Sequence, residues 1–318
     1  MPKNVLPCTV FMRLPLPPSI VAIAILLLGF LSAPSRADIL YVANFNGSTI
    51  VRFTTDGVGS IFASSGLSSP FGLAFDSARN LYVSNNNNTI VKITPSGTTS
   101  VFASTGLSGP RGLAFDSAGN LYVANIGTGS IVKFTPAGVG SVFASTGLVA
   151  PFGLAFDRTG NLFVANRANN TIAKITPDGV SSLFADTAFG QPSGLAFNSA
   201  GILYVTNGLN STIDRYTPDG VRSLFAGNGL AQPNGLAFDS SGNLYEAGGV
   251  FGNYLIKEFA PDGVGSFFAS TGLNAPGLLA FTDDFGVPLK LPNQVPEPSA
   301  FALLGLASVA LGFFRARR

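Results

Sequence analysis

A unit of 40 to 41 residues occurs six times in this chain, and this repetition limits the fold to architectures built from equivalent modules. Each unit contains four strings of four to six residues rich in Ile, Val, Phe and Tyr, which predicts four β-strands per unit. Counted from the GLAF-like string, the four strings resemble GLAF, LYVAN, TIVKITPDG and SVFASTGL. The LYVAN-like strings begin at Leu40, Leu81, Leu121, Leu162, Leu203 and Leu244, and the GLAF-like strings begin at Gly72, Gly112, Gly153, Gly194, Gly235 and Gly277.

The connectors between these strings carry turn residues. The segment 116–120 has the pattern D-S-x-G-N, in which the Asp accepts hydrogen bonds from turn N–H groups and Gly119 takes a positive φ. In the first such turn Arg79 stands where the other turns have glycine, so we expect it to adopt a strained left-handed conformation. A Pro-x-Gly sequence, as at Pro136, predicts a type I turn between the third and fourth strings.

The phase of the repeats indicates how the array ends. The first unit begins at LYVAN with no GLAF string before it, and the last ends at the GLLAF string that starts at Gly277. A C-terminal strand that pairs with the N-terminal strand would complete that unit and leave no unpaired end. The sequence therefore predicts an all-β fold, a six-bladed β-propeller with four-stranded blades over residues 38–284.

The repeats resemble those of NHL-repeat propellers, which run Pro-x-Gly-hydrophobic-Ala-hydrophobic-Asp and then Gly-Asn-hydrophobic-Tyr-Val-Ala-Asp. This chain departs from that pattern because the closing Asp is replaced by Asn. Streptogramin lyases and gluconolactonase-type propellers look similar at the level of the repeat. The resemblance implies a catalytic His for the former and a metal held by acidic residues and Asn for the latter; the chain has no His, and the sequence reveals no matching acidic cluster.

The N-terminal segment 1–37 has the features of a secretory signal peptide. Lys3 and Arg13 precede twelve consecutive apolar residues, 20–31, which are too few for a transmembrane helix of about 20 residues. Small residues then lead to Ala37 and Asp38, between which we expect signal peptidase to cleave.

The C-terminal segment 295–318 follows a linker, 285–294, and combines three features in one order. Pro296, Glu297 and Pro298 precede fifteen uncharged residues, 300–314, which are followed by an Arg-rich end. This arrangement resembles the PEP-CTERM sorting signal of Gram-negative bacteria. It implies transient membrane insertion of a short hydrophobic helix, cleavage by an exosortase-type protease, and delivery to the cell surface or extracellular matrix, often in species that secrete exopolysaccharide. A tail anchor that remains in the membrane is the alternative.

Composition excludes several classes of function. With no His, the chain lacks the commonest metal ligand and the usual general base near neutral pH, and its one cysteine, Cys8, lies in the segment that is cleaved off. Six of the 18 basic residues lie in the two end segments, which leaves twelve against 16 acidic residues. A mildly acidic body does not favour nucleic-acid binding. We expect no cofactor and no bound metal.

Two sets of loops are expected to open on the same face of the propeller, and this face is the candidate binding face. One set joins the fourth strand of a blade to the first strand of the next, and the other joins the second strand to the third. The position between Pro and Gly before each GLAF string varies in chemistry, as expected of a specificity position. Beside it we expect a ring of amides; the alternative is that these amides only close their own turns. The candidate ligand-binding residues are Phe71, Arg111, Phe152 and Asn234, with Ser193 at the same position, and Asn44, Asn85, Asn125, Asn166 and Asn207.

Two further features of the repeats are the acidic residue Glu246 and a recurring basic position. Glu246 replaces the Val of LYVAN, and it is either the single acid of a pore-facing site or a buried residue paired with a cation such as Lys257. One basic residue recurs in the third string of five units, which predicts a solvated row that discourages edge pairing. These residues are Arg52, Lys92, Lys133, Lys174 and Arg215.

Three functional hypotheses follow. The leading one is a secreted, non-enzymatic propeller that binds carbohydrate or protein in the cell envelope or extracellular matrix. The second is a metal-assisted lactonase or lyase, in which Asn and Asp side chains and Glu246 hold a divalent cation. The third is a structural matrix component that has no saturable ligand.

Overall fold

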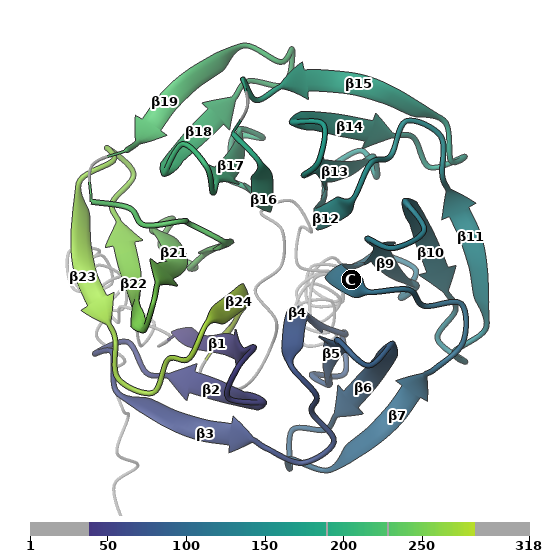
Figure 1. Ribbon diagram of the computed structural model, residues 1–318, viewed down its shortest axis with the longest axis horizontal. Helices are drawn as coiled ribbons and strands as arrows, with labels where there is room; N and C mark the ends of the chain where they lie inside the picture. The colour runs from purple at the N-terminus through teal and green to yellow at the C-terminus, as the bar shows by residue number, and fades with distance from the viewer. Residues whose placement is uncertain (1–37, 189, 228, 284–318) are drawn as a thin grey trace, which may run out of the picture. The chain divides into compact units, whose positions relative to one another are not determined.

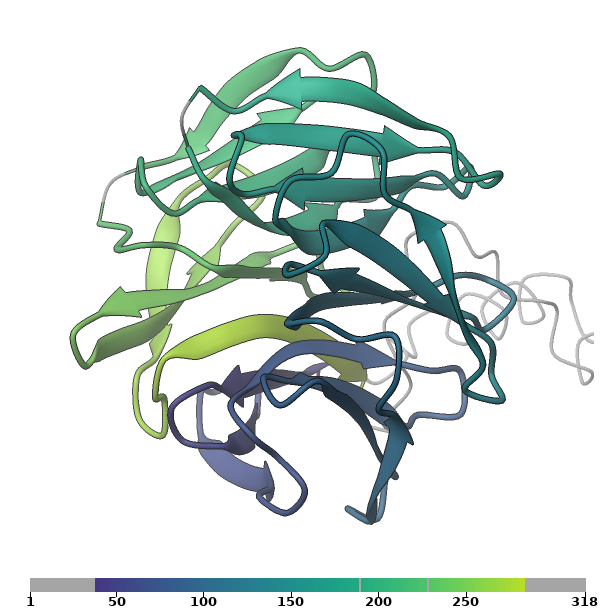
Figure 2. The ribbon, with the colours of Figure 1, turned by 45° about the vertical axis from the view of Figure 1, so that its right-hand side comes forward.

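The chain forms 24 β-strands in six four-stranded sheets that stand around a common centre (Figure 1). This computed structural model describes residues 38–188, 190–227 and 229–283, and no helix occurs among them. Figure 2 shows that each sheet is twisted, as the blades of a propeller are. The prediction of an all-β, six-bladed propeller with four-stranded blades is confirmed.

The export and sorting segments lie outside the described residues, together with Ala37, Pro296, Glu297, Pro298 and the linker 285–294. Asp38, on the other side of the expected cleavage point, is the first residue that the structure describes. A search of the described residues for helices long and apolar enough to cross a bilayer found none.

Each blade runs outward from the centre in the order of the chain, except the first. In blade 1 the order is β24-β1-β2-β3, and blades 2 to 6 begin with β4, β8, β12, β16 and β20. The innermost strands are β24 (Pro276–Asp283), β4 (Pro70–Phe75), β8 (Pro110–Phe115), β12 (Pro151–Phe156), β16 (Pro192–Phe197) and β20 (Gly235–Phe238). The second strands are β1 (Asp38–Asn44), β5 (Leu81–Asn85), β9 (Leu121–Asn125), β13 (Leu162–Asn166), β17 (Leu203–Asn207) and β21 (Leu244–Val250).

The third and fourth strands complete each blade, and the fourth strand is the exposed one. The third strands are β2 (Thr49–Phe53), β6 (Thr89–Ile93), β10 (Ser130–Phe134), β14 (Thr171–Ile175), β18 (Thr212–Tyr216) and β22 (Asn253–Phe259). The outermost strands are β3 (Gly59–Ala63), β7 (Thr99–Ala103), β11 (Gly140–Ala144), β15 (Ser181–Asp186), β19 (Arg222–Ala226) and β23 (Gly265–Ala269).

The last strand closes the ring. β24 pairs antiparallel with β1, with Phe281 opposite Leu40 and Leu279 opposite Val42. The predicted pairing of the C-terminal strand with the N-terminal blade is therefore confirmed. Since residues 38–283 contain every described strand and close on themselves, this segment is a complete folding unit.

The core consists of apolar clusters between neighbouring blades, each built around the aromatic residue of a second strand. Tyr41 of blade 1 contacts Phe62 of the same blade and Phe75 of blade 2, with ring centroids 5.0 Å apart in both pairs. The same edge-to-face arrangement recurs around the ring, and Tyr245 completes it through Phe268 and the closing residue Phe281. Many of the Phe residues in the described part of the chain thus serve packing between and within blades.

The turns have the predicted chemistry. Asp116 Oδ1 accepts hydrogen bonds from the backbone N–H groups of Ala118 (3.0 Å) and Asn120 (2.8 Å), and Gly119 has φ 80°. Arg79 takes the left-handed conformation expected of it, with φ 69°. The non-glycine residue therefore bears the strain that glycine avoids in the equivalent turns.

The row of third-strand cations has a role other than the predicted one. The outer edge of each blade is the fourth strand, so these residues lie one strand inside the edge. Lys92 Nζ lies 5.5 Å from the ring centroid of Tyr82, Lys133 Nζ 5.2 Å from that of Tyr122, and Lys174 Nζ 5.7 Å from that of Phe163. They cover the aromatic residue of the neighbouring second strand, and the prediction of a solvated edge row is wrong.

Candidate functional site

Both sets of loops open on one face of the propeller, as expected. The loops that join second to third strands donate backbone hydrogen bonds to the loops that lead into the first strands. Examples are Asn86 N to Ser68 O (2.9 Å) and Arg167 N to Ala150 O (3.2 Å). We call this side of the ring the loop face.

Two phenylalanines close the centre of the loop face. Phe71 follows Pro70 at the start of β4, and Phe152 follows Pro151 at the start of β12, so their side chains come from blades 2 and 4. Their ring centroids are 4.9 Å apart with an interplanar angle of 77°, and Phe45 packs against Phe71 at 6.2 Å. Only 8% of Phe71 and 3% of Phe152 is exposed. The two rings therefore form a plug instead of an open aromatic surface.

An arginine covers each of these rings. Arg111 Cζ lies 5.3 Å from the ring centroid of Phe71, and Arg167 Cζ lies 4.7 Å from that of Phe152. Arg111 comes from β8 and donates hydrogen bonds to the carbonyl oxygen of Pro110 (3.1 Å) and to Asn86 Oδ1 (3.2 Å). We call Arg111 and Arg167, with the two phenylalanines beneath them, the arginine pair.

Burial and mutual repulsion act on these two cations. Burial lowers the pKa of Arg111, and the positive charge of Arg167 lowers it further. Burial also lowers the pKa of Arg167. Both groups remain protonated at neutral pH because an arginine titrates far above it. The centre of the loop face therefore holds two adjacent, partly desolvated positive charges.

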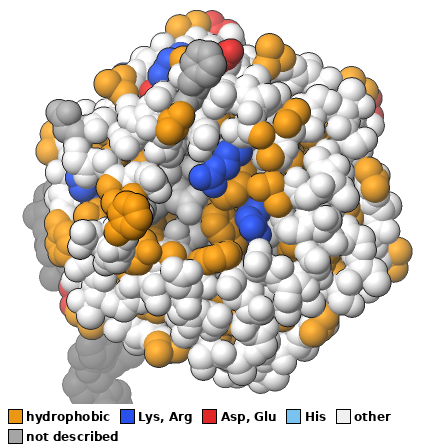
Figure 3. Space-filling model, in the orientation of Figure 1, with side chains coloured by type: hydrophobic (Ala, Val, Ile, Leu, Met, Phe, Trp, Pro, Cys, Tyr) orange, Lys and Arg blue, Asp and Glu red, His pale blue; other side chains and the backbone are white. Residues whose placement is uncertain are grey.

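The rest of the loop face is nearly free of charge. Its described loops, which include 64–69, 104–109, 126–129 and 208–211, are made mainly of Ser, Thr, Gly, Asn and apolar residues, and Arg167 is the one basic residue in them. Asp186, at the end of β15, is an acid on this face, and its charge acts on Tyr216 and Arg222 of blade 5. Figure 3 shows basic side chains gathered at the centre of the ring among apolar and uncharged ones. The turns of the opposite face contain most of the surface acids, such as Asp76, Asp116 and Asp178.

Arg167 was not among the residues that the sequence singled out. It follows the LYVAN-like string directly, in a loop whose counterparts contain Phe45, Asn86, Ile126 and Gly208 at that place. Its positive charge, which no other residue of these described loops carries, was the signal that could have identified it.

Phe251 is a second residue that sequence reasoning missed. It lies at the tip of a hairpin in which β21 and β22 extend to Val250 and Asn253, longer than their counterparts. Phe251 is 99% exposed and has φ 51°, and Gly252 after it has φ 89°. This is the two-residue turn that normally prefers Asn-Gly, so the chain holds an aromatic side chain in solvent at a conformational cost of about 1 kcal/mol.

The other two predicted specificity positions face neighbouring strands. Ser193 Oγ donates to the carbonyl oxygen of Pro233 at 3.2 Å, and Asn234 Nδ2 donates to the carbonyl oxygen of Pro276 at 3.2 Å. Each thus joins its own innermost strand to the next blade. The structure brings Phe71, Arg111 and Phe152 together but gives Ser193 and Asn234 separate contacts.

The predicted amides form hydrogen bonds within the framework. Asn125 Nδ2 donates to the carbonyl oxygen of Gly106 (2.8 Å), and Asn125 Oδ1 accepts from the backbone N–H of Ser108 (3.2 Å). Asn44, Asn85 and Asn166 bind the equivalent loops in the same way. All of these side chains are buried, and the contacts named here hold the loop that leads into the innermost strand and not the turn that follows each Asn.

These bonds predict a large and local effect of substitution. We expect Asn125→Ala to lower the free energy of unfolding by about 2 kcal/mol, because it leaves a buried N–H and a carbonyl without partners. Asn125→Asp should cost less, since a carboxylate still accepts from Ser108 but cannot donate to Gly106. Urea unfolding of the propeller, with the exposed Asn87→Ala as control, measures the difference; equal midpoints for all variants would contradict this role.

Asn207 differs because its partner is an acid. Asn207 Nδ2 donates to Asp214 Oδ2 at 2.7 Å, and Arg222 Nε donates to the same oxygen at 2.7 Å. Asp214 occupies a third-strand position that is Val51, Val91 or Val132 in other blades, and its side chain is fully buried. The arginine and the amide compensate the buried charge of the aspartate.

Glu246 lies inside blade 6, against the loop that leads into β20. It is 1% exposed, and a Cβ added at Gly248 would lie 2.5 Å from Glu246 Oε1 and 3.0 Å from the carbonyl oxygen of Ala231. Burial raises the pKa of Glu246 to about 8, while the charge of Lys257, opposite it in the register, lowers it. Glu246 is therefore mostly neutral at pH 7.

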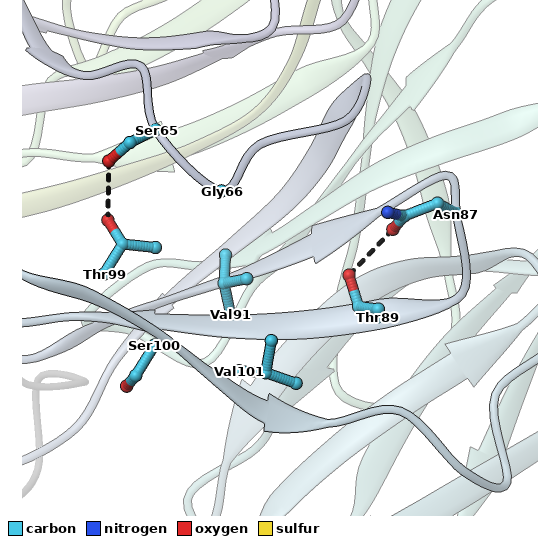
Figure 4. A pocket seen from close by; sticks show the side chains of 8 residues that line it. All are labelled: Ser65, Gly66, Asn87, Thr89, Val91, Thr99, Ser100 and Val101. Carbon is cyan, nitrogen blue, oxygen red and sulfur yellow. Dashed lines mark hydrogen bonds between the residues drawn. The ribbon is translucent and has the colours of Figure 1, made fainter.

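The described residues contain no group of three or more His, Cys, Asp or Glu side chains placed to hold a metal ion. A hollow of about 250 Å³ lies between blades 1 and 2, away from the arginine pair (Figure 4). Its lining is small and uncharged, with Thr89 Oγ1 donating to Asn87 Oδ1 at 2.7 Å, and Ser65 and Thr99 facing each other. Nothing in this hollow is suited to catalysis.

Residues 294–318 match the PEP-CTERM protein-sorting motif. The chain therefore carries this motif at its C-terminus, and the motif implies export and sorting by exosortase-type machinery to the cell surface of a Gram-negative bacterium. No curated protein matches the chain.

Solved structures with the same fold are numerous but distant in sequence. A chain of a nidogen/laminin complex is 21% identical, with a TM-score of 0.69 over 77% of this chain and 98% of that one. Virginiamycin B lyase from Staphylococcus aureus is 20% identical, with a TM-score of 0.56 over 67% and 77% of the two chains. A gluconolactonase from Xanthomonas campestris is 19% identical, with a TM-score of 0.59 over 76% and 88%. The propeller thus has neighbours of the streptogramin lyase and gluconolactonase type.

Proposed function

From a C-terminal sorting motif and a six-bladed propeller with a cationic centre, we propose that this chain is an exported, non-enzymatic binding protein. It acts in the cell envelope or extracellular matrix, where the loop face of the propeller binds carbohydrate or protein. Signal peptidase and an exosortase-type protease remove the two end segments. The sorting motif supports the location, and the geometry of the loop face supports binding.

The observation that carries the binding function is the arginine pair. Framework residues in this fold recur from blade to blade, as the asparagines that end the second strands and the aromatic residues of those strands do. Arg111 and Arg167 do not recur, and Phe stands between Pro and Gly only in blades 2 and 4, as Phe71 and Phe152, at the point where all blades converge. A charged and partly exposed cluster that does not follow the repeat, at the centre of a face with little other charge, is where specificity for a partner can reside.

The second candidate is a metal-assisted lactonase or lyase. It is suggested by two solved structures with the same fold, which are a gluconolactonase and a virginiamycin B lyase. In this chain the buried acids Asp38, Asp214 and Glu246 lie in blades 1, 5 and 6, and Asp214 is engaged by Arg222 and Asn207. The centre of the loop face holds the arginine pair.

An array of glycans and peptides probed with the propeller, residues 38–283, tests the proposal. We expect saturable binding that the double variant Phe71→Ala/Phe152→Ala weakens about tenfold or more, because removing the plug takes away the surface on which both arginines lie. The matched control is Val101→Ala/Leu183→Ala, which removes apolar residues from the outermost strands of the same two blades; these are 64% and 70% exposed.

The outcomes separate the hypotheses. Hits that the plug variant leaves unchanged, while it melts as the control does, would contradict the loop face as the site. A melting temperature raised by Ca²⁺ or Zn²⁺, with hydrolysis of a lactone, would favour the enzyme. The absence of any saturable ligand would favour a structural matrix component.

A further inference from the structure

The arginine pair lacks the counter-charge that partly buried cations in proteins normally have. Within the described residues the ion pairs are Lys92 with Asp76, Lys133 with Asp116 and Arg222 with Asp214, and none includes Arg111 or Arg167. The residues that shift the pKa of the pair include no carboxylate. A partly desolvated cation without a partner costs free energy, and two such cations side by side repel each other.

Most of the hydrogen-bond donors of the pair are also unused. Each guanidinium has five N–H groups. Arg111 uses two of them on Pro110 O and Asn86 Oδ1, and the structure gives Arg167 no hydrogen-bond acceptor among the described residues. The side chain of Arg167 is ordered by the ring of Phe152 instead. Donors of this kind, held in place and not satisfied, match the oxygens of an anion.

The two guanidinium groups lie over neighbouring, contacting rings at the centre of the loop face. The rings that they cover are 4.9 Å apart, and each Cζ lies within 5.3 Å of its ring centroid. The charge of Arg167 also lowers the pKa of Arg111. The acids of the propeller lie mainly in the turns of the opposite face, and Asp186, which ends β15 on the loop face, acts on Tyr216 and Arg222 and not on the arginine pair.

We propose that Arg111 and Arg167 together bind a carboxylate or phosphate group of the ligand at the centre of the loop face. This inference rests on the proposed binding function and specifies the ligand as acidic. The plug of Phe71 and Phe152 positions the two guanidinium groups before the ligand arrives, which lowers the entropic cost of binding. The aromatic rings contribute through the arginines that they hold and not through direct stacking on a sugar.

Isothermal titration with matched probes tests this inference on the propeller, residues 38–283. The carboxylate probes are trigalacturonate against its methyl ester and a pentaglutamate peptide against pentaglutamine; inorganic phosphate is the third arm. We expect at least one charged probe to bind at least tenfold more tightly than its neutral partner, or phosphate to bind saturably. Arg111→Gln and Arg167→Gln should each weaken that binding about tenfold or more. The arm that binds identifies the source of the anionic group.

The control is Arg158→Gln, which removes the same charge from an exposed turn between β12 and β13 on the opposite face. It should bind as the unaltered propeller does. Equal binding of charged and neutral probes, or binding unaffected by both arginine substitutions, would overturn the inference. If ligands from the array bind at the plug without any dependence on charge, the proposed function stands and the inference alone fails. If no ligand binds the loop face, both fail.

Melting temperatures in two salts separate an effect on binding from an effect on folding. Because the two cations repel each other, we expect Arg167→Gln to melt at the same temperature as the unaltered propeller or higher in sodium chloride. Sodium phosphate at equal ionic strength should raise the melting temperature of the unaltered propeller and of Arg158→Gln, but not that of Arg167→Gln. The same phosphate effect in all three proteins would count against the site.

Discussion

A chain that ends at Ala275, and therefore lacks β24, is expected to lose its cooperative unfolding transition. β24 is the innermost strand of blade 1, and it pairs with β1 and packs against blade 6. Its removal exposes the edge of β1 and the faces that bury Leu279 and Phe281. Each of these side chains contributes about 2 to 3 kcal/mol of burial, and with the lost hydrogen bonds the total approaches the whole stability of a domain, about 5 to 15 kcal/mol.

Differential scanning calorimetry of three proteins measures this effect. The propeller that ends at Asp283 should melt in one sharp transition. Phe281→Ala should lower the free energy of unfolding by about 3 kcal/mol, since it removes one buried ring that contacts Tyr245. The chain that ends at Ala275 should show no sharp transition. A cooperative transition within a few degrees of that of the full propeller would show that the ring does not depend on its closing strand.

Glu246→Gln is expected to stabilise the propeller at neutral and alkaline pH. The folded pKa of Glu246, about 8, lies above its ordinary value of 4.5. Between these two values the folded state binds a proton that the unfolded state has released, so the stability falls as the pH rises from about 4.5 to about 8 and is level above that. At pH 7 the cost is about 3 kcal/mol, which the uncharged glutamine avoids.

Melting curves at pH 5, 7 and 9 check this prediction. We expect the variant and the unaltered propeller to melt together near pH 5, and the variant to melt about 6 to 12 °C higher at pH 7, with a larger difference at pH 9. Glu246→Val, which restores the residue of the other repeats, should remove the same pH dependence and leave ligand binding intact. Identical pH profiles would mean that Glu246 is ionised in the folded protein.

The repeat pattern predicts the features that all six blades share. The spacing of the strings, the turn residues and the phase of the first and last units were sufficient to predict the closed ring. They were also sufficient to predict the left-handed conformation of Arg79, since its neighbours in the repeat are glycines. Because these features are local or periodic, the sequence of one blade is enough to predict the same features in the next.

The centre of the ring could be predicted only in part. The sequence identified Phe71, Arg111 and Phe152 as variable in chemistry, but the rings cover each other because innermost strands from different blades converge there. Arg167 joins them from a loop about 55 residues after Arg111, and no repeat spacing connects the two. The third-strand cations were misinterpreted for a related reason: their aromatic partners lie across the sheet, not along the chain.

The binding of an acidic group by the arginine pair can be seen directly in a crystal structure of the propeller, residues 38–283, with the tightest-binding acidic probe. We expect the carboxylate or phosphate group of the probe within about 3 Å of guanidinium nitrogens of both Arg111 and Arg167, above the undisturbed plug of Phe71 and Phe152. A probe bound elsewhere on the ring, or arginines turned away to acidic side chains of the protein, would contradict it.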